Sequence, residues 1–205
     1  MTLPFKSPFS LFSSTEKPME FAAFARNSTR TPPSLVQLIK EDLDAFLAYD
    51  PSTRSKLETV LFSAGFRAVM GHRIEHALWK SGHTFLARML AKHTRRVTGI
   101  EIHPAAQFGR RTIIDHGTGI VIGSTAIIGN NVLIYQGVTL GASNPQQAGR
   151  RHPKLGNGVL VGANAVVLGG ITIGDNAKIG AGAVVVKDVP ASLTVVGVPA
   201  HTWFT

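Results

Sequence analysis

The sequence predicts an α+β protein, with an N-terminal α-helical region followed by a parallel β-helix of hexapeptide repeats. Two observations support this prediction. From residue 102 to residue 189 a six-residue unit recurs, with an apolar residue first, Gly commonly second and a small or β-branched residue fifth. Before it, residues 34–96 carry apolar side chains at helical spacing. A short fixed period is typical of a solenoid, in which each unit buries its apolar face only against stacked neighbours.

The repeat recurs in thirteen units, with one slip and one insertion. We expect the first residue of each unit to point inward, and these residues are Ile102, Phe108, Ile114, Ile122, Ile128, Ile134, Leu140, Leu155, Val161, Val167, Ile173, Ile179 and Val185. The fifth positions, Thr118 among them, are expected to point inward as well. A two-residue slip precedes Ile122, and residues 142–154 form an insert that leaves the repeat. Each unit should form one short strand and one corner, where Gly permits backbone geometry that a Cβ hinders.

These patterns divide the chain into four regions. We expect a poorly ordered leader over residues 1–33, a helical region over 34–99, the β-helix over 100–190 with its inserted loop 142–154, and a C-terminal tail over 191–205.

Three helices are expected in the helical region. The first begins at Ser34, which stands at capping-box spacing from Gln37, and ends at Asp50, because a proline follows and the residue before proline avoids helical geometry. A second is expected over about residues 53–79 and a third, short and basic, over about residues 85–96.

Composition narrows the class of protein. The chain has 205 residues, a net charge of +9 and no cysteine, which excludes disulfides and a protein thiol nucleophile. No apolar run is long enough to span a membrane, and residues 1–33 lack the compact apolar core of a secretory signal. We therefore expect a cytoplasmic protein without a membrane partner. Basic residues are not interleaved with base-stacking aromatics, so an anionic small ligand is favoured over nucleic acid.

Two histidines are candidates for chemistry. His116 is followed in the repeat by Gly117 and Gly119, which clear space on the surface, and an imidazole there can act as a general base. Glu101 precedes it by fifteen residues, which places the carboxylate on the neighbouring coil as an orienting acid, unless the two are unrelated surface residues. His152 lies beside Arg151 in the insert, and a loop on a rigid scaffold often carries function, although a solvated basic loop is the alternative.

Several segments together resemble the serine O-acetyltransferases. The resemblance runs from about residue 34 to residue 200 and is carried by Glu101-Ile102-His103-Pro104-Ala105-Ala106, Asp115-His116-Gly117-Thr118-Gly119, Gly137-Val138-Thr139-Leu140-Gly141, Arg151-His152-Pro153-Lys154 and Gly197-Val198-Pro199-Ala200. It implies a left-handed β-helix with three units per coil. It also implies direct transfer of acetyl from acetyl-CoA to the L-serine hydroxyl, giving O-acetylserine for cysteine synthesis, with no metal and no permanently bound cofactor.

The resemblance implies roles for particular residues. His116 matches the general base, and Glu101 stands where the family has an aspartate that partners it. Asp50 and Asp115 match the carboxylates that hold the amino group of serine. Arg151 and His152 match the loop residues that hold its carboxylate, reaching across from a neighbouring subunit. Acetyl-CoA is expected along the prism edge near Gly141, Gly162, Ala163, Gly180, Ala181 and Lys187.

The resemblance also bears on assembly. A site shared between chains implies a homo-oligomer, and the short helical region favours a trimer over the family's hexamer. The tail lacks the terminal isoleucine that docks into the partner sulfhydrylase, which argues against that complex. The short tail leaves feedback binding of cysteine open.

Three other functions remain as alternatives. The acceptor hydroxyl could belong to homoserine, a sugar or an antibiotic, although paired charges at Asp50, Asp115 and Arg151 favour an amino acid. A zinc hydratase like the γ-class carbonic anhydrases needs three histidine ligands, and only His116 and His152 are well placed. A non-catalytic solenoid is disfavoured because the base, its carboxylate and the loop residues are all present.

Overall fold

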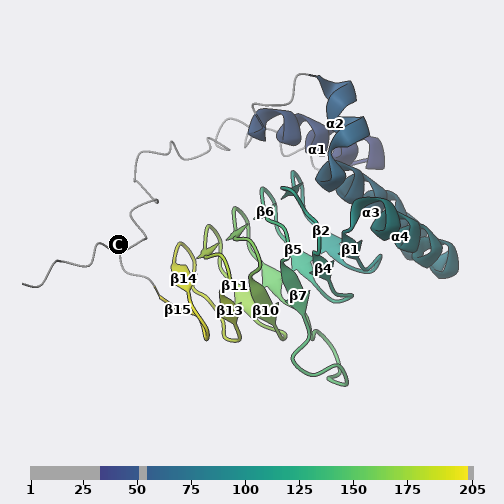
Figure 1. The fold of residues 1–205 in the computed structure, drawn as a ribbon. Helices are drawn as coiled ribbons and strands as arrows, with labels where there is room; N and C mark the ends of the chain where they lie inside the picture. Colours follow the sequence, from purple (N-terminus) through teal and green to yellow (C-terminus); the bar gives the residue numbers. More distant parts are fainter. Residues whose placement is uncertain (1–32, 51–54, 203–205) are drawn as a thin grey trace, which may run out of the picture. The chain divides into compact units, whose positions relative to one another are not determined.

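The structure of the chain is a computed structural model, and it describes residues 33–50 and 55–202. Nearly all of the expected leader, and the last three residues of the tail, lie outside the described residues. The described parts belong to one compact unit. It has a helical layer at one end, and a prism of short strands extends away from that layer (Figure 1).

Four described helices form the N-terminal region, and they are α1 (Leu35–Tyr49), α2 (Lys56–Phe62), α3 (Ala64–Lys80) and α4 (Thr84–Thr98). The capping box of α1 is confirmed, because Ser34 Oγ accepts from the Gln37 amide at 3.3 Å and the Gln37 side chain accepts from the Ser34 amide at 2.8 Å. The expected single helix over 53–79 is wrong. It divides at Ser63, whose hydroxyl accepts the amide of Phe66 at 3.2 Å and so caps α3.

Fifteen described strands follow: β1 (Glu101–Ile102), β2 (Gln107–Phe108), β3 (Ile113–Ile114), β4 (Val121–Ile122), β5 (Ile127–Ile128), β6 (Leu133–Ile134), β7 (Thr139–Gly141), β8 (Lys154–Leu155), β9 (Leu160–Val161), β10 (Val166–Leu168), β11 (Thr172–Ile173), β12 (Lys178–Ile179), β13 (Val184–Val185), β14 (Thr194–Val196) and β15 (His201–Thr202). They form three sheets, which we call face 1 (β1-β4-β7-β10-β13), face 2 (β2-β5-β8-β11) and face 3 (β3-β6-β9-β12-β14-β15). The first thirteen strands coincide one for one with the thirteen predicted units.

Each coil crosses the three faces in turn and turns a corner between one face and the next. Two of the three resulting edges carry predicted site residues. The corners after the face 3 strands form the first, which we call the His116 edge (residues 115–120, 135–138, 162–165 and 180–183). The corners after the face 1 strands form the second, which we call the loop edge (residues 103–106, 123–126, 142–153 and 169–171).

The core of the prism is a stack of aliphatic ladders. On face 1, Ile102 pairs with Ile122 and Ile122 with Leu140, and each of these side chains is at most 5% exposed. Of the thirteen first positions, twelve are buried and Phe108 is half-buried. The inward position expected for Thr118 is wrong: Thr118 is exposed and Ile120 points inward at 1% exposure. The two-residue slip lies in this corner, so the chain bulges outward around His116.

A buried ion pair joins the helices to the first coil. Arg73 of α3 donates to both carboxylate oxygens of Asp42 on α1, at 2.9 and 3.2 Å, and to the carbonyl oxygens of Phe108 and Gly109 at 3.0 and 2.5 Å. Gly65 allows α3 to approach β3 closely, because a Cβ on this residue would lie 1.9 Å from the Ile114 carbonyl oxygen. The helical layer is therefore fixed against β2 and β3, which lead to the His116 edge.

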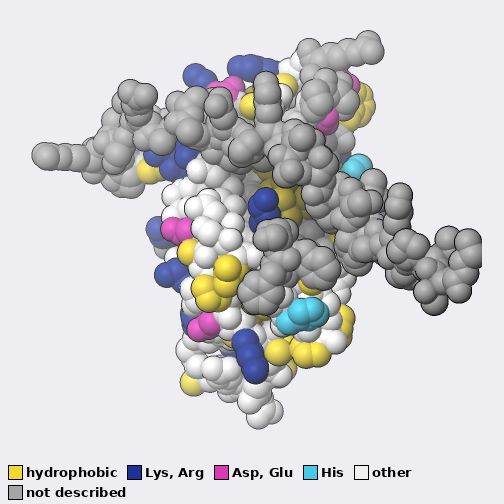
Figure 2. Space-filling view, turned by 90° about the vertical axis from the view of Figure 1, so that its left-hand side faces the viewer, with side chains coloured by type: hydrophobic (Ala, Val, Ile, Leu, Met, Phe, Trp, Pro, Cys, Tyr) yellow, Lys and Arg dark blue, Asp and Glu magenta, His cyan; other side chains and the backbone are white. Residues whose placement is uncertain are grey.

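The strands continue past the expected end of the β-helix at residue 190. β14 pairs in parallel with β12, and β15 folds back antiparallel on β14. No helix in the described part of the chain is long and apolar enough to cross a membrane. On the surface drawn in Figure 2, Lys and Arg side chains are scattered over the described residues and do not form one continuous patch.

Candidate active site

His116 occupies the bulged corner after β3. Its backbone is left-handed, with φ 58°, and its side chain is 75% exposed. Gly117 and Gly119 also have positive φ, 79° and 80°, a region that favours glycine. A Cβ on Gly117 would lie 2.4 Å from Ile100 Cδ1. The glycines thus allow the corner to close on the core while the imidazole stands free in solvent, where a substrate can reach it.

The carboxylate nearest to His116 is Asp115. Its Oδ1 lies 3.9 Å from His116 Nε2, whereas Glu101 forms an ion pair with Arg95 of α4 at 3.0 Å. Among the described residues no ion pair joins Glu101 to His116, so the expected contact is not formed in this structure. The sheet register explains the difference, because Glu101 aligns with Val121 on face 1 and the end of α4 supplies a competing cation.

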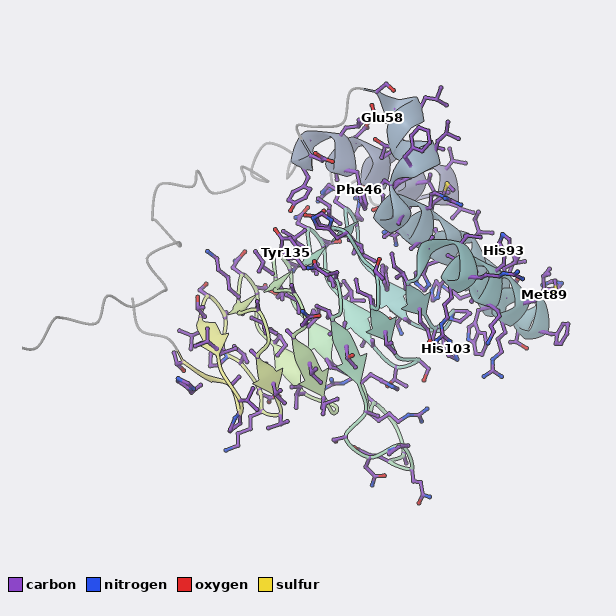
Figure 3. The ribbon with its side chains drawn as sticks, viewed as in Figure 1. Phe46, Glu58, Met89, His93, His103 and Tyr135 are labelled. Atoms are coloured by element: carbon purple, nitrogen blue, oxygen red, sulfur yellow. The ribbon has the colours of Figure 1, made fainter. Side chains whose placement is uncertain are left out.

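Two tyrosines form a hydrogen-bonded chain that ends on Asp115, and the sequence alone indicated neither. Tyr49, the last residue of α1, donates its hydroxyl to Asp115 Oδ2 at 2.9 Å, and the Tyr135 hydroxyl lies 2.9 Å from that of Tyr49. Burial, followed by these two contacts, raises the pKa of the Tyr49 hydroxyl. Figure 3 labels Tyr135 on the solenoid beneath α1, the helix that carries Phe46. Asp115 is therefore held between the helical layer and the second coil.

Asp50 follows Tyr49 directly and is the C-cap residue of α1. Its amide donates to the Phe46 carbonyl at 3.0 Å, and its side chain is half-buried. The bond from Tyr49 to Asp115 thus brings the segment that carries Asp50 to the His116 edge. His116 and Asp115 thus lie at this edge together with the end of α1, the element whose C-cap residue is Asp50.

His152 lies at the loop edge and is 8% exposed. Its Nδ1 accepts the Thr125 amide at 3.2 Å and lies 2.8 Å from Thr125 Oγ1. Burial, reinforced by nearby Arg151 and His103, lowers the pKa of the imidazole, which favours the neutral ring. A Cβ on Gly123 would lie 2.0 Å from this ring, so that glycine is needed for His152 to pack.

The insert is tied to the prism by the two residues that precede His152. Arg151 donates its amide to Thr125 Oγ1 at 3.1 Å and its guanidinium to Ser124 Oγ at 3.4 Å. Arg150 donates to the Ile171 carbonyl at 2.8 Å. The loop base is thus rigid, and the half-buried guanidinium of Arg151 is held by only one side-chain contact among the described residues.

The residues expected along acetyl-CoA do not share one edge of a single chain. Gly162, Ala163, Gly180 and Ala181 follow face 3 strands and lie on the His116 edge. Gly141 ends β7 and Lys187 follows β13, so both belong to the far side of face 1, with Arg151 and His152. The width of face 1 therefore separates the predicted site residues of one chain into two halves.

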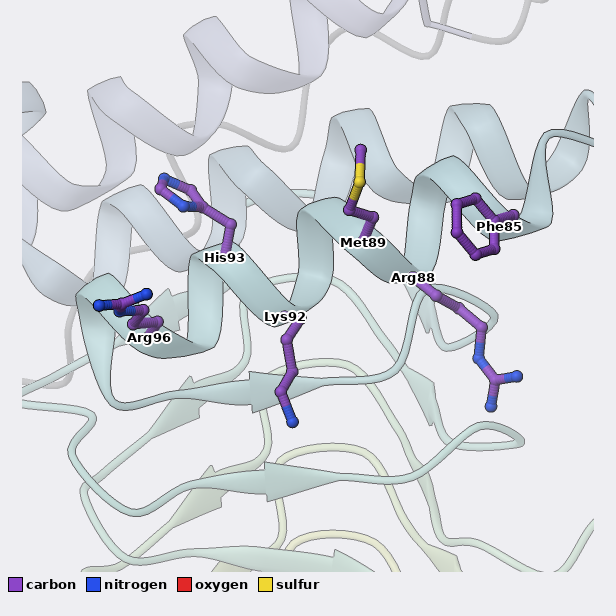
Figure 4. Close-up of a pocket in the computed structure, with 6 residues that line it drawn as sticks. All are labelled: Phe85, Arg88, Met89, Lys92, His93 and Arg96. Atoms are coloured by element: carbon purple, nitrogen blue, oxygen red, sulfur yellow. The ribbon is translucent and has the colours of Figure 1, made fainter.

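A shallow open pocket lies outside both halves. It is formed along α4 by Phe85, Arg88, Met89, Lys92, His93 and Arg96 (Figure 4). Within residues 33–50 and 55–202, no group of three or more His, Asp or Glu side chains is arranged to hold a metal ion.

The coiled prism with a solvent-exposed histidine at one edge defines a hexapeptide-repeat transferase. A family model for the bacterial transferase hexapeptide (six repeats) matches residues 152–187, and one for the hexapeptide repeat of succinyl-transferase matches residues 107–136. A third, for the N-terminal part of serine acetyltransferase, matches residues 10–70.

Whole-chain comparisons narrow the class. A serine acetyltransferase of Bacillus subtilis is 50% identical over 163 residues, which cover 80% of this chain and 75% of that protein. The structure of the Neisseria gonorrhoeae serine acetyltransferase matches with a TM-score of 0.80 and 48% identity, over 83% of this chain and 65% of that one. The soybean serine acetyltransferase complexed with serine matches with a TM-score of 0.80 and 45% identity, over 84% and 70%.

This chain belongs to the serine acetyltransferase family, and its fold is the left-handed parallel β-helix of that family. It spans about two thirds of the length of the Neisseria gonorrhoeae structure that it matches.

Proposed function

We propose that this chain transfers the acetyl group of acetyl-CoA to the hydroxyl of L-serine in the cytoplasm, giving O-acetylserine for cysteine synthesis and free CoA. Acetyl transfer to serine is the activity for which its family is named. The observation that carries the proposal is the meeting of His116, Asp115 and the end of α1, which bears Asp50, at one edge of the prism. The soybean relative with serine bound supports the choice of acceptor.

The chemistry assigns one task to each group. The His116 imidazole takes the proton from the serine hydroxyl as its oxygen attacks the acetyl carbonyl carbon. The C–S bond of the thioester then breaks, and the proton passes to the departing CoA sulfur. Asp50 and Asp115 hold the ammonium of serine, and Arg151 with His152 holds its carboxylate. Glu101 can orient His116 only after it exchanges its partner Arg95.

Acetyl-CoA is assigned to a groove between two chains. The small residues Gly162, Ala163, Gly180 and Ala181 of one chain allow the pantetheine arm to approach the backbone. Gly141 and Lys187 of the next chain would complete the groove, where the ammonium of Lys187 suits the phosphates of CoA. No resident cofactor is needed for this reaction.

The division of the site between two edges supports a trimer. Closed three-fold symmetry brings the His116 edge of each chain against the loop edge of the next and leaves no half-site unused. We expect sedimentation in dilute buffer to give a mass near three chains. Six chains would add an interface between trimers, and a fully active monomer would contradict the shared site.

Mixed oligomers of two variants test whether each active site is formed by two chains. His116→Ala removes one half of the site and Arg151→Ala the other, so chains carrying both intact halves are absent from the mixture. We expect coexpressed variants to recover activity at low serine concentration, because some junctions pair the intact His116 edge with an intact loop edge. Activity no higher than that of the separate variants would contradict the model.

Acceptor identity is tested with acetyl-CoA and a panel of hydroxyl compounds, by following release of the free thiol. We expect serine to be the preferred acceptor, since its ammonium and carboxylate match the charges at Asp50, Asp115 and Arg151. Homoserine, a sugar and a hydroxyl without charged neighbours serve as the comparison. Preference for homoserine would keep the chemistry and change the acceptor. If no compound of the panel supports thiol release, the proposal is overturned.

Arg151→Ala should weaken serine binding selectively. The change removes a cation that we assign to the serine carboxylate, and a charge-assisted bond of this kind contributes about 1.5–3 kcal/mol. We expect the KM for serine to rise by about tenfold or more, in line with about 1.4 kcal/mol per factor of ten, with the KM for acetyl-CoA nearly unchanged. The opposite pattern would assign Arg151 to the phosphates of CoA.

A further inference from the structure

The tyrosine pair, Tyr49 and Tyr135, comprises the only two tyrosines of the chain. They come from different elements, one from the end of α1 and the other from the corner after β6. The register of face 3 aligns Ile114 with Ile134, so the next residues, Asp115 and Tyr135, stack on adjacent coils. Tyr49 then reaches in from the helical layer and bonds to both.

The direction of these hydrogen bonds follows from counting protons. An ionised carboxylate only accepts, so Tyr49 gives its single hydroxyl proton to Asp115 Oδ2. The bond between the two hydroxyls must therefore run from Tyr135 to the oxygen of Tyr49. Because burial and these contacts raise the pKa of Tyr49, its hydroxyl keeps this proton at neutral pH. The result is a directed chain from Tyr135 through Tyr49 to the carboxylate.

This chain leaves the two oxygens of Asp115 unequal. Oδ2 is occupied by Tyr49, whereas Oδ1 faces the His116 imidazole, 3.9 Å from Nε2. A substrate held beside His116 therefore meets a carboxylate whose rotation is restrained and whose free oxygen points to the reacting group. Restraining a ligand-binding group before the substrate arrives lowers the entropy lost on binding.

We propose that Tyr49, supported by Tyr135, is a positioning residue that orients Asp115 toward the amino group of the acceptor. That the acceptor carries an amino group rests on the proposed function, in which the acceptor is serine. Tyr49 also precedes Asp50, so the same hydrogen bond sets where the second carboxylate enters the site. One phenol thus positions both proposed ammonium ligands, although they are separated by more than sixty residues in the sequence.

Kinetics of Tyr49→Phe and Tyr135→Phe test the proposal, since each change removes a hydroxyl and keeps the ring. For Tyr49→Phe we expect the serine KM to rise about tenfold, which corresponds to about 1.4 kcal/mol, with kcat and the acetyl-CoA KM nearly unchanged. For Tyr135→Phe we expect a smaller rise of about two- to threefold, because the bond to Asp115 remains. In the double variant, loss of the Tyr135 hydroxyl should add nothing, since its acceptor is already gone.

Asp44→Asn is the matched control, because Asp44 also lies on α1 and forms an ion pair with the exposed Lys56, away from the His116 edge. It should change neither KM. An unaltered serine KM in Tyr49→Phe, an equal rise in both KM values, or additive effects of the two tyrosine changes would each overturn the inference. If the wild-type chain acetylates serine while Tyr49→Phe behaves identically, the inference fails and the proposed function stands. If no acceptor is acetylated, the proposed function fails, and calorimetric titration of serine alone still measures whether Tyr49→Phe weakens binding about tenfold.

Discussion

His116→Ala should lower the rate of acetyl transfer by about 100- to 10,000-fold, the usual contribution of a general base. The imidazole is the group at this corner to which we assign the proton, because the neighbouring Asp115 accepts the Tyr49 hydroxyl and is assigned to the substrate. The His116 side chain is 75% exposed and holds no structural contact beyond Asp115 among the described residues, so its removal should not unfold the chain. Stopped assays of kcat with saturating serine measure the effect.

A control measurement distinguishes loss of the general base in His116→Ala from loss of acetyl-CoA binding. Acetyl-CoA affinity, followed by calorimetry, should stay close to that of the wild type, because no predicted CoA residue touches the imidazole. His152→Ala is the comparison, since that ring is 8% exposed and packs against Gly123, so its loss should also disturb the loop edge. Near wild-type turnover in His116→Ala would remove this residue from the mechanism.

Asp42→Ala should destabilise the fold by about 3–5 kcal/mol, the usual cost of leaving a buried charge without its partner. The Arg73 and Asp42 side chains are 5% and 1% exposed, and Asp42 also accepts the backbone amides of Thr112 and Arg111. The substitution therefore strands a guanidinium and two amides at the junction of the helices with the first coil. Denaturant unfolding followed by far-UV circular dichroism measures the loss.

Asp44→Ala supplies the control for this stability prediction. Asp44 lies two positions along the same helix, and its ion pair with Lys56 is 37% and 64% exposed. Exposed pairs of this kind contribute about 0–1 kcal/mol, so the midpoint of unfolding should scarcely move. Equal losses in the two variants would mean that the Asp42–Arg73 contact does not fix the helical layer.

The hexapeptide core could be predicted from the sequence because its signal is local and repeated. Each of the thirteen first positions lies within a strand, and the Ser34 cap needs only two residues at fixed spacing. Thr118 was misplaced because the slip in register could not be located within its corner. Ser63 divided the expected helix because a hydroxyl cap outweighed a continuous apolar pattern.

The candidate site was harder to predict because its contacts join distant elements. The sequence indicated His116, Asp115, Arg151 and His152, but only the coiled topology assigned them to different edges. Nothing local marks Tyr49 as a partner of Asp115, although Tyr135 could have been found by noting that it occupies the same place in its unit as Asp115. The Glu101–His116 pairing was predicted from the spacing of the two residues and from the resemblance, and neither accounted for Arg95 at the end of α4.

The closing segment after β13 has a consequence for solubility. A stack of parallel coils ends in open strand edges, which invite another chain to add on and grow a fibre. Here the last rung of each face is covered: Val189 bridges Ile173 of β11, Gly197 and Ala200 bond to Val184 of β13, and β15 pairs with β14. At the other end α3 and α4 lie against β3 and β1. Both ends of the solenoid are thus covered. A truncation before residue 189 should expose the strand edges of the last coil and cause the chains to associate through them.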